Sequence, residues 1–428
     1  ENGTQPMQLH WQGETYVMVY NGELYNTPEL RAALQSCGHT FAGHSDTEVL
    51  LHAYAQWGGA CAERCNGIFA FAVWSEQQGI LFLARDRCGV KPLFYIQKQD
   101  GVIFGSELKT LLAHPAVEPK IDSDGLAQIM LLGPGRVPGS GVFCGVRELL
   151  PGQCAEFDTN TGHLSLRRYW YLTDHEHPDD FAATVRRLRE LLLDAIHRQL
   201  VADVQVGALV SGGLDSGILA SVADAAFAET GKTLHTFSVG YKDNKRYFHA
   251  TKFQPGADAP FIRTMNENLH ATHHWVTLDT PQLVQALYRA VDARDLPGMA
   301  DVDSSLLEFC RVIKPHATVV LSGECADEIF GGYPWYRDPT VREKYGFPWA
   351  QSTAYRASFL RSDVLGGIDP AAFVDAHYRR ALAETSALAG LSPLEHRMRQ
   401  MTNLNFYWFM QTLLERKDRM SMYSGLEV

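Results

Sequence analysis

The chain has 428 residues, of which 46% are hydrophobic and 20% are charged, the composition of a globular protein of two or three domains. Its net charge of −11 speaks against nucleic acid or an anionic membrane as the main partner, and no apolar run reaches the roughly 18 residues of a membrane helix. The eight cysteines are scattered without a CxxC pair, and the sequence shows no signal peptide, so we expect reduced thiols and a cytoplasmic location.

Up to about residue 168, short runs of β-branched and aromatic residues, separated by turn residues, predict strands. These runs lie at 16–20, 69–74, 80–84, 92–96 and 102–105. The spacing of the last four indicates an antiparallel meander. Thr27 as N-cap and Pro28 at the first helical position predict a helix that ends near Gly38. A second helix is expected from Asp46 to Trp57.

Beyond this region the pattern changes to alternating strands and helices. A polar, proline-bearing stretch, DHEHPDD, precedes an amphipathic helix that begins near residue 181. We therefore predict a first domain over 1–168, a linker over 169–180 and a second domain over 181–428. The alternation indicates an α/β fold with a parallel sheet and helices on its faces, followed by a mostly helical part from residue 340.

Two glycine-bearing loops follow strands of the second domain. The first, LVSGGLDSGIL at 209–219, opens a helix, so its backbone N–H groups and the hydroxyls of Ser211 and Ser216 form an anion site. The second, SGECADEIFGGY at 322–333, also follows a strand. If these strands are parallel in one sheet, both loops emerge at the edge where such sheets bind ligands. Asp215 and Asp327 would then share a Mg²⁺ ion that carries phosphates.

The two loops resemble segments of known families. SGGLDS is similar to the pyrophosphate loop of ATP pyrophosphatases, and SGECADEIFGGY resembles the matching segment of asparagine synthetases. The resemblance implies cleavage of ATP between its α and β phosphates. It assigns to the nucleotide the residues Leu209, Ser211, Gly212, Gly213, Asp215, Ser216, Val239, Ser322 and Gly323. Leu209 and Val239 would contact the adenine, although apolar strand ends are also candidates for the core.

The amino-terminal half resembles the class II glutamine amidotransferase domain, an αββα sandwich with an N-terminal nucleophile. The resemblance rests on VYNGELYNTPELR, GHSDTEVLLHAY, NGIFAFAVW and RDRCGVKPLFY. It implies that Asn21 and Gly22 form the oxyanion hole for the glutamine amide, while Glu23 and Asp46 hold the glutamine amino group. Asn-Gly is also a signal for a hairpin turn, but GELYN shows no partner strand and leads straight into the predicted helix.

The sequence contains no match to the family's N-terminal cysteine nucleophile or to its arginine for the glutamine carboxylate. We expect both residues to precede Glu1, and the family's pyrophosphate-binding lysine to follow Val428. Both ends of the chain are therefore expected to be trimmed.

Together the resemblances imply a ligase of asparagine biosynthesis that uses glutamine, aspartate, ATP, Mg²⁺ and ammonia; a homodimer is left open. Aspartate's side chain would attack the α-phosphate of MgATP to give β-aspartyl-AMP and pyrophosphate. Ammonia released from glutamine would then displace AMP. Glu324 matches the position that promotes adenylation and assists ammonia as a base, and we expect nearby phosphates to raise its pKa. Alternatively, Glu324 is only a helix cap.

The residues that bind aspartate are harder to identify. Arg294 and Asp301, in the segment RDLPGMADVDSS, are candidates, and Asp303 is expected to cap a helix that begins at Ser304. The RKDR cluster at 416–419 is typical of a charged helix face, although its cations could meet a carboxylate.

Two other functions stay open at this stage. One is a ring-closing synthetase similar to β-lactam synthetases or lasso-peptide cyclases, which have lost the glutaminase nucleophile. The other is a non-catalytic regulator that senses glutamine or ATP. The presence of Asn21, Gly22, Glu23 and Asp46 favours working glutamine chemistry, and the acids of the two loops favour catalysis.

Overall fold

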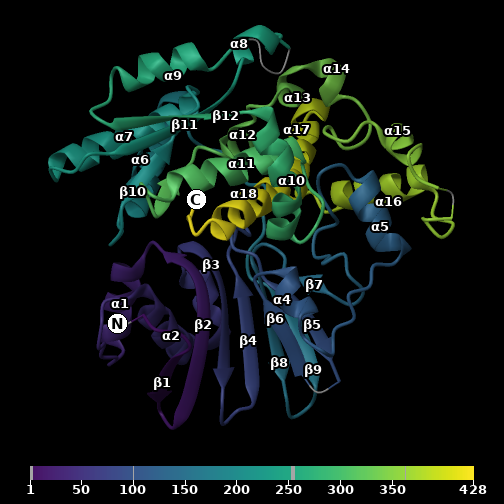
Figure 1. Ribbon diagram of the computed structural model, residues 1–428. Helices are drawn as coiled ribbons and strands as arrows, with labels where there is room; N and C mark the ends of the chain where they lie inside the picture. Colours follow the sequence, from purple (N-terminus) through teal and green to yellow (C-terminus); the bar gives the residue numbers. More distant parts are fainter. Residues whose placement is uncertain (1–2, 100, 252–255, 362) are drawn as a thin grey trace. The chain divides into compact units, whose positions relative to one another are not determined.

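The computed structural model describes residues 3–99, 101–251, 256–361 and 363–428 (Figure 1). Within it the chain forms two compact units, which we call unit 1 and unit 2. Unit 1 comprises Glu1–Thr173, Trp349–Glu384 and Phe406–Glu415, and unit 2 comprises Asp174–Pro348, Thr385–Asn405 and Arg416–Val428. Segments of the C-terminal part of the chain thus belong to each unit.

Unit 1 contains two antiparallel sheets. The larger has the strand order β1–β2–β3–β4–β8–β9 and the smaller has the order β6–β5–β7. Their bounds are β1 Met7–Trp11, β2 Glu14–Leu24, β3 Gly67–Ser75, β4 Ile80–Arg85, β5 Phe94–Lys98, β6 Gly101–Gly105, β7 Arg147–Glu148, β8 Gln153–Asp158 and β9 His163–Arg168. The predicted strands are all present, and β3–β4 and β5–β6 pair antiparallel as the predicted meander requires, but the link from β4 to β5 is wrong. β4 pairs with β8, whereas β5 belongs to the other sheet.

Apolar side chains arrange unit 1 in four layers. Helices α1 (Thr27–Ser36) and α2 (Asp46–Trp57) cover one face of the larger sheet, where Leu34, Leu50 and Met18 share a buried core. On the opposite face, Leu83 of β4 packs with Tyr95 of the smaller sheet. A further helix, α4 (Leu108–Leu112), contacts β5 and β6. This αββα order is the one expected for an N-terminal-nucleophile glutaminase fold.

The ends of α1 and α2 show how local sequence sets these helices. Ser45 caps α2, because its hydroxyl accepts a hydrogen bond from the Glu48 backbone N–H at 3.2 Å, and the helix has the predicted bounds. α1 begins at Thr27, one residue earlier than predicted, and its N-cap is Asn26, not Thr27. The Thr27 hydroxyl instead donates to the Leu24 carbonyl at 2.6 Å, which fixes the turn between β2 and α1.

Unit 2 is built on a parallel sheet with the order β12–β11–β10–β13, as the alternating pattern predicts. The strands are β10 Val206–Leu209, β11 His235–Tyr241, β12 Thr272–Leu278 and β13 Val319–Leu321. Ala208 and Val210 pack with Ala220 of α7 (Leu214–Glu229), whereas Phe237 and Val320 pack with Phe309 of α11 (Asp301–Ile313). Helices therefore cover both faces of the sheet.

The other helices of the described chain complete the two units. In unit 1 they are α3 Cys61–Arg64, α5 Ser123–Leu131, α15 Thr353–Ala357 and α16 Pro370–Ala383, with a 3₁₀ turn at Gly58–Ala60. In unit 2 they are α6 Phe181–Gln199, α8 Asn244–Tyr247, α9 Ala259–Asn266, α10 Thr280–Arg294, α12 Ala326–Phe330, α13 Pro334–Arg337, α14 Pro339–Arg342 and α17 Pro393–Leu404. A π-helical turn, Asn405–Phe409, leads into α18 (Met410–Tyr423), which contributes residues to both units. No helix in the described ranges is long and apolar enough to cross a bilayer.

Candidate active sites

The first glycine loop of unit 2 is held in shape by its own serines. The Ser216 hydroxyl lies 3.0 Å from the Ser211 hydroxyl and 3.1 Å from the Ser211 backbone N–H, which donates to it. Ser216 is buried, whereas Asp215, beside it in the first turn of α7, is exposed. The loop is thus ordered from within and presents its acid outward.

Glycine is required at one point of this loop, and a second glycine begins the helix without a side-chain cap. Gly212 has a φ of 81°, and a Cβ there would lie 2.9 Å from the Ile262 backbone nitrogen. Gly213 is the N-cap of α7 and offers no side chain to its first N–H groups. Those N–H groups, together with the helix dipole, form the kind of site that binds phosphate.

The second loop lies directly against the first. β10 and β13 are parallel neighbours, so both loops leave the sheet at the same edge. A Cβ on Gly323 would approach the Ser216 backbone nitrogen to 2.8 Å, so only glycine permits this contact. Burial raises the pKa of the Asp327 carboxyl, and repulsion from Asp215 raises it further. The two carboxylates are therefore close enough to oppose each other's charge, which a divalent cation between them would relieve.

Glu324 has a different environment from the one that the sequence predicts. Its carboxylate pairs with Arg416 through Oε1 and with Lys417 through Oε2, and Lys417 also donates to the Ser322 hydroxyl. Burial alone would raise the pKa of Glu324, but the charges of Lys417 and Arg416 outweigh it and hold this pKa below its usual value. The expected upward shift is wrong for this structure, because the residues facing the carboxylate are two cations.

The alternative reading of Glu324 as a helix cap is also wrong. The short helix α12 begins at Ala326, with Cys325 as its N-cap. The RKDR cluster is not a solvated helix face either, since Lys417, Asp418 and Arg419 are all buried. A charge run on an amphipathic helix does not reveal in sequence which face the fold covers.

Glu328 is a residue of this region that the sequence reasoning missed. It is 3% exposed, and Tyr333 donates to its Oε1 at 2.7 Å. Burial raises its pKa, with Asp327 and Glu324 adding repulsion. Its Oε2 has no hydrogen-bond partner among the residues that the structure describes. In the sequence Glu328 directly follows Asp327 in the motif ADE, and this position beside a predicted metal-binding acid could have identified it.

The remaining predicted positions of unit 2 are dispersed. Leu209 and Val239 pack partly against the core formed around Phe237, so they are core contacts as well as candidates for the adenine. Arg294 is buried and pairs with Asp303 at 3.3 Å, whereas Asp301 is exposed at the start of α11. The predicted capping role of Asp303 is wrong, because α11 begins at Asp301, three residues before the predicted start at Ser304. The Asp303 carboxylate instead accepts from the Met299 N–H at 2.9 Å.

In unit 1 the Asn-Gly pair lies inside β2. Gly22 pairs with Phe69 of β3, so the expectation that GELYN has no partner strand is wrong, and the pair is not a hairpin turn. Gly22 has a φ of 149°, and a Cβ there would clash with the Ile68 carbonyl. The Asn21 side-chain amide donates to the Ser106 hydroxyl at 3.4 Å.

Asp46 lies against the same stretch of β2. Its Oδ2 accepts from the Tyr20 hydroxyl at 2.9 Å and from the Leu24 backbone N–H at 3.1 Å, and its Oδ1 accepts from the Thr47 N–H at 2.7 Å. Burial raises the pKa of Tyr20, and the Asp46 charge raises it further. Glu23, between these contacts on β2, is exposed. The four predicted glutamine-site residues are therefore gathered where β2 meets the start of α2.

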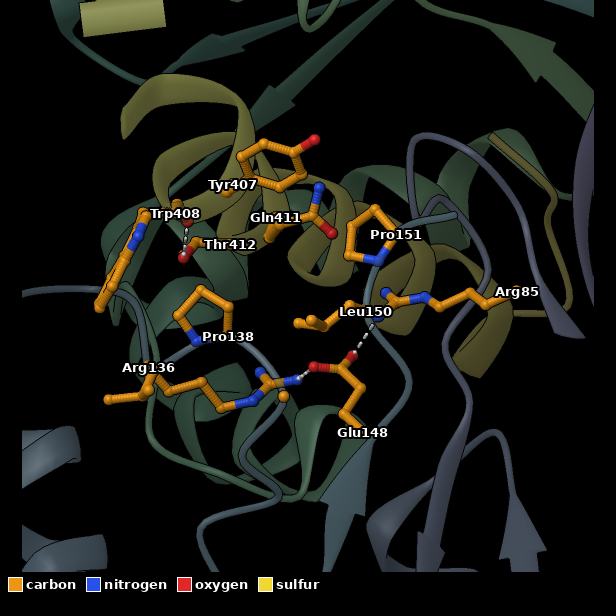
Figure 2. Close-up of a pocket in the computed structure, with 12 residues that line it drawn as sticks. Arg85, Arg136, Pro138, Glu148, Leu150, Pro151, Tyr407, Trp408, Gln411 and Thr412 are labelled. Atoms are coloured by element: carbon orange, nitrogen blue, oxygen red, sulfur yellow. Dashed lines mark hydrogen bonds and ion pairs between the residues drawn. The ribbon is translucent and has the colours of Figure 1, made fainter. Parts of the chain in front are cut away.

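A pocket elsewhere in unit 1 contains none of the predicted residues (Figure 2). Glu148 lies between Arg85, at 3.0 Å, and Arg136, at 2.8 Å, and Arg136 also pairs with Glu415 of α18. Burial alone would lower the pKa of Arg136, but Glu148 and Glu415 raise it. This network joins α18 to the loop before β7, and we assign it a role in stability and not in catalysis.

Comparisons with known proteins match both regions of the chain that contain these candidate sites. Residues 1–170 match the family model described as a glutamine amidotransferase domain, and residues 187–428 match the one described as asparagine synthase. Among solved structures, glutamine phosphoribosylpyrophosphate amidotransferase from B. subtilis complexed with ADP and GMP is 16% identical with a TM-score of 0.30, covering 64% of each chain. That likeness is too low to carry an argument.

Curated relatives extend over the whole chain. Asparagine synthetase [glutamine-hydrolyzing] 3 of Bacillus subtilis (strain 168) is 48% identical over 429 residues, which cover 100% of this chain and 69% of the relative. Asparagine synthetase [glutamine-hydrolyzing] 1 of the same organism is 34% identical over 342 residues, which cover 79% of this chain and 51% of the relative. The chain therefore belongs to the glutamine-hydrolysing asparagine synthetase family, a family of enzymes that carries an amidotransferase domain before its synthetase domain.

Proposed function

We propose that the full-length protein makes asparagine from aspartate through a β-aspartyl-AMP intermediate, with ammonia from glutamine, and that it releases AMP and pyrophosphate. One observation carries this proposal: the two acid-bearing loops touch at Gly323 and Ser216, at one edge of a parallel sheet. That edge joins a phosphate-binding helix start to a pair of repelling carboxylates.

The phosphates of ATP are assigned to the loop of Ser211, Gly212, Gly213 and Ser216. Its serine hydroxyls and the first N–H groups of α7, which no side chain caps among the described residues, are donors, and donors of this kind stabilise the charge of a departing pyrophosphate. Asp215 and Asp327 suit a Mg²⁺ ion, because their mutual repulsion falls when a divalent cation binds. Two carboxylates would fill only part of its coordination shell, so phosphate oxygens and water would have to supply the rest. When bound, the ion neutralises phosphate charge.

Glu324 is assigned the catalytic role next to these loops. Glu324 directly follows Gly323, the residue through which the two loops touch. Its two cationic partners keep its carboxylate ionised. An ionised carboxylate is able to accept a proton from attacking ammonia. Ser322 and Gly323 would contact the nucleotide. Arg294, which pairs with the neighbouring Asp303, is the weaker candidate for aspartate, together with Asp301.

The glutamine site is assigned to unit 1. The Asn21 amide and Gly22 N–H would donate to the oxyanion, while the carboxylates of Glu23 and Asp46 would accept from the glutamine ammonium group. Asp46 is held by three donors, so its carboxylate is fixed before a ligand arrives. We also propose that the protein works in the cytoplasm and that it forms a homodimer.

Product analysis of the full-length protein with MgATP, aspartate and either glutamine or ammonium tests the proposal. We expect AMP, pyrophosphate and asparagine in equal amounts, and loss of asparagine formation by at least about 10²-fold in Glu324→Gln. Glu343→Gln, an exposed acid of unit 2, is the matched control. Aspartate-independent AMP formation, or a cyclised product from another substrate, would favour the ring-closing alternative. ATP binding without AMP would favour the regulator.

A further inference from the structure

Two basic residues of α18 converge on one carboxylate in unit 2. Arg416 reaches Oε1 of Glu324 and Lys417 reaches Oε2. We call Arg416 and Lys417 the cation clamp. They lie in unit 2 together with Glu324, and the Lys417 amine additionally donates to the Ser322 hydroxyl.

The clamp carries more charge than its partner neutralises. The side chains of Arg416 and Lys417 are only 12% and 9% exposed, and Glu324 offers a single negative charge. The next two residues, Asp418 and Arg419, carry opposite charges and pair with each other at 3.5 Å. A buried cation without a full counter-charge is costly, so the site favours a second anion.

The clamp also retains hydrogen-bonding capacity. Arg416 Nε is buried and has no partner in the part of the chain that the structure describes. The Lys417 ammonium has three donors, of which Ser322 and Glu324 take two. Multi-donor cations of this kind suit the oxygens of a phosphate.

The position of the clamp indicates that its anion is a phosphate of the bound nucleotide. Ser322 follows the last residue of β13, and the next residue, Gly323, touches Ser216 and Asp215 of the first loop. The Lys417 amine is therefore one hydrogen bond and one residue away from the loop assigned to the phosphates of ATP. Asp215 and Asp327, on the same edge, would repel phosphate unless a metal ion or cations compensate.

We propose that Arg416 and Lys417 bind phosphate oxygens of the nucleotide, and that they exchange Glu324 for these oxygens when MgATP enters. This inference rests on the proposed function of unit 2. Glu324 then acts as a competing internal anion that holds the clamp in place. Release of Glu324 from one or both cations would free its carboxylate at the moment when the nucleotide is bound.

Binding of MgATP to the full-length protein, measured by equilibrium dialysis, tests the exchange without requiring turnover. Lys417→Met should weaken MgATP binding by about 10- to 100-fold, the effect of one charge-assisted hydrogen bond. Lys417→Arg should restore most of the loss, whereas Lys232→Met, an exposed lysine of the same unit, should bind like the wild type. Glu324→Gln should tighten binding, because it removes the competing anion, and Lys417→Met should reduce that gain.

Other outcomes overturn the inference. Unchanged MgATP binding in Lys417→Met with a raised half-saturating aspartate concentration would assign the clamp to the substrate carboxylate. Unchanged values for both ligands would make Lys417 only a structural partner of Glu324. If Lys417→Met fails to fold, Lys417→Gln combined with Glu324→Gln removes both charges of the pair and repeats the measurement against Glu324→Gln alone. A wild type that binds MgATP but forms no AMP would refute the proposed function, while the binding comparisons would still decide the clamp.

Discussion

A buried pair of histidines makes unit 1 sensitive to acid. His39 Nδ1 and His52 Nδ1 are 2.8 Å apart, and His39 Nε2 lies 2.9 Å from Oε1 of Gln56. Both hydrogen bonds form when His39 Nε2 donates to Gln56 and His52 Nδ1 donates to His39 Nδ1. Trp11 stacks on His39 with ring centroids 3.8 Å apart, so the pair joins α2 to the end of β1.

The size of the effect follows from the pKa of His52. Burial lowers it from 6.5 to about 4, with further contributions from His39 and Arg31, while Glu48 acts in the opposite direction. A depressed histidine pKa means that the unfolded chain binds the proton first. The contribution of neutral His52 to the free energy of unfolding is therefore fully present above pH 6.5 and is lost as the pH falls toward 4. The full difference is about 3 kcal/mol, and linkage gives about 2 kcal/mol of loss between pH 7.5 and 5.

Urea unfolding of wild type and His52→Gln over this pH range measures the effect. Hydrogen exchange of peptides from α2 reports the same loss locally, because the two units need not unfold together. His52→Gln retains a donor for His39 but does not titrate, so its free energy of unfolding should change less with pH. His163→Gln removes an exposed histidine and serves as the control. Equal pH dependence in the wild type and His52→Gln would refute the reasoning.

Three substitutions test other parts of the structure. Gly22→Ala should reduce glutamine-dependent synthesis by at least about 10²-fold through the clash with the Ile68 carbonyl, and ammonium-dependent synthesis should persist; loss of both would indicate misfolding instead. Gly323→Ala should weaken MgATP binding by pushing Ser216 away, and an unchanged affinity would contradict the contact between the loops. Arg136→Met should lower the free energy of unfolding by about 3–5 kcal/mol because it removes the buried cation that pairs with both Glu148 and Glu415, and a urea midpoint like that of the wild type would contradict this role.

Local signals in the sequence predicted much of the fold. The predicted bounds of α2 agree with the structure, in which Ser45 caps the helix, and strand–helix alternation predicted the parallel sheet of unit 2. The pairing of β4 was not predictable in this way. Its partner β8, QCAEFD, has a weak strand pattern and lies about 70 residues later, so only tertiary packing selects it over β5.

The candidate site was predictable to the extent that its motifs are contiguous. The glycines, serines and acids of the two loops can be read directly from the sequence. The contact between the loops follows because the strands before them are parallel neighbours. The partners of Glu324 come from α18, more than 90 residues away, and charge patterning alone favours an exposed face for them. Their burial depends on how α18 packs, and the direction of the Glu324 pKa depends on that packing.

The charges of unit 2 explain why its two loops and α18 would act together on a nucleotide. Asp215 and Asp327 repel each other and would also repel phosphate, whereas Arg416 and Lys417 present more positive charge than Glu324 balances. A magnesium complex of ATP carries the complementary pattern, a cation for the acids and phosphate oxygens for the clamp. Metal-free ATP would satisfy the clamp but not the acids, so its affinity should lie well below that of MgATP. Because both halves flank the same contact between Gly323 and Ser216, binding of the complex compensates opposite charges at one sheet edge.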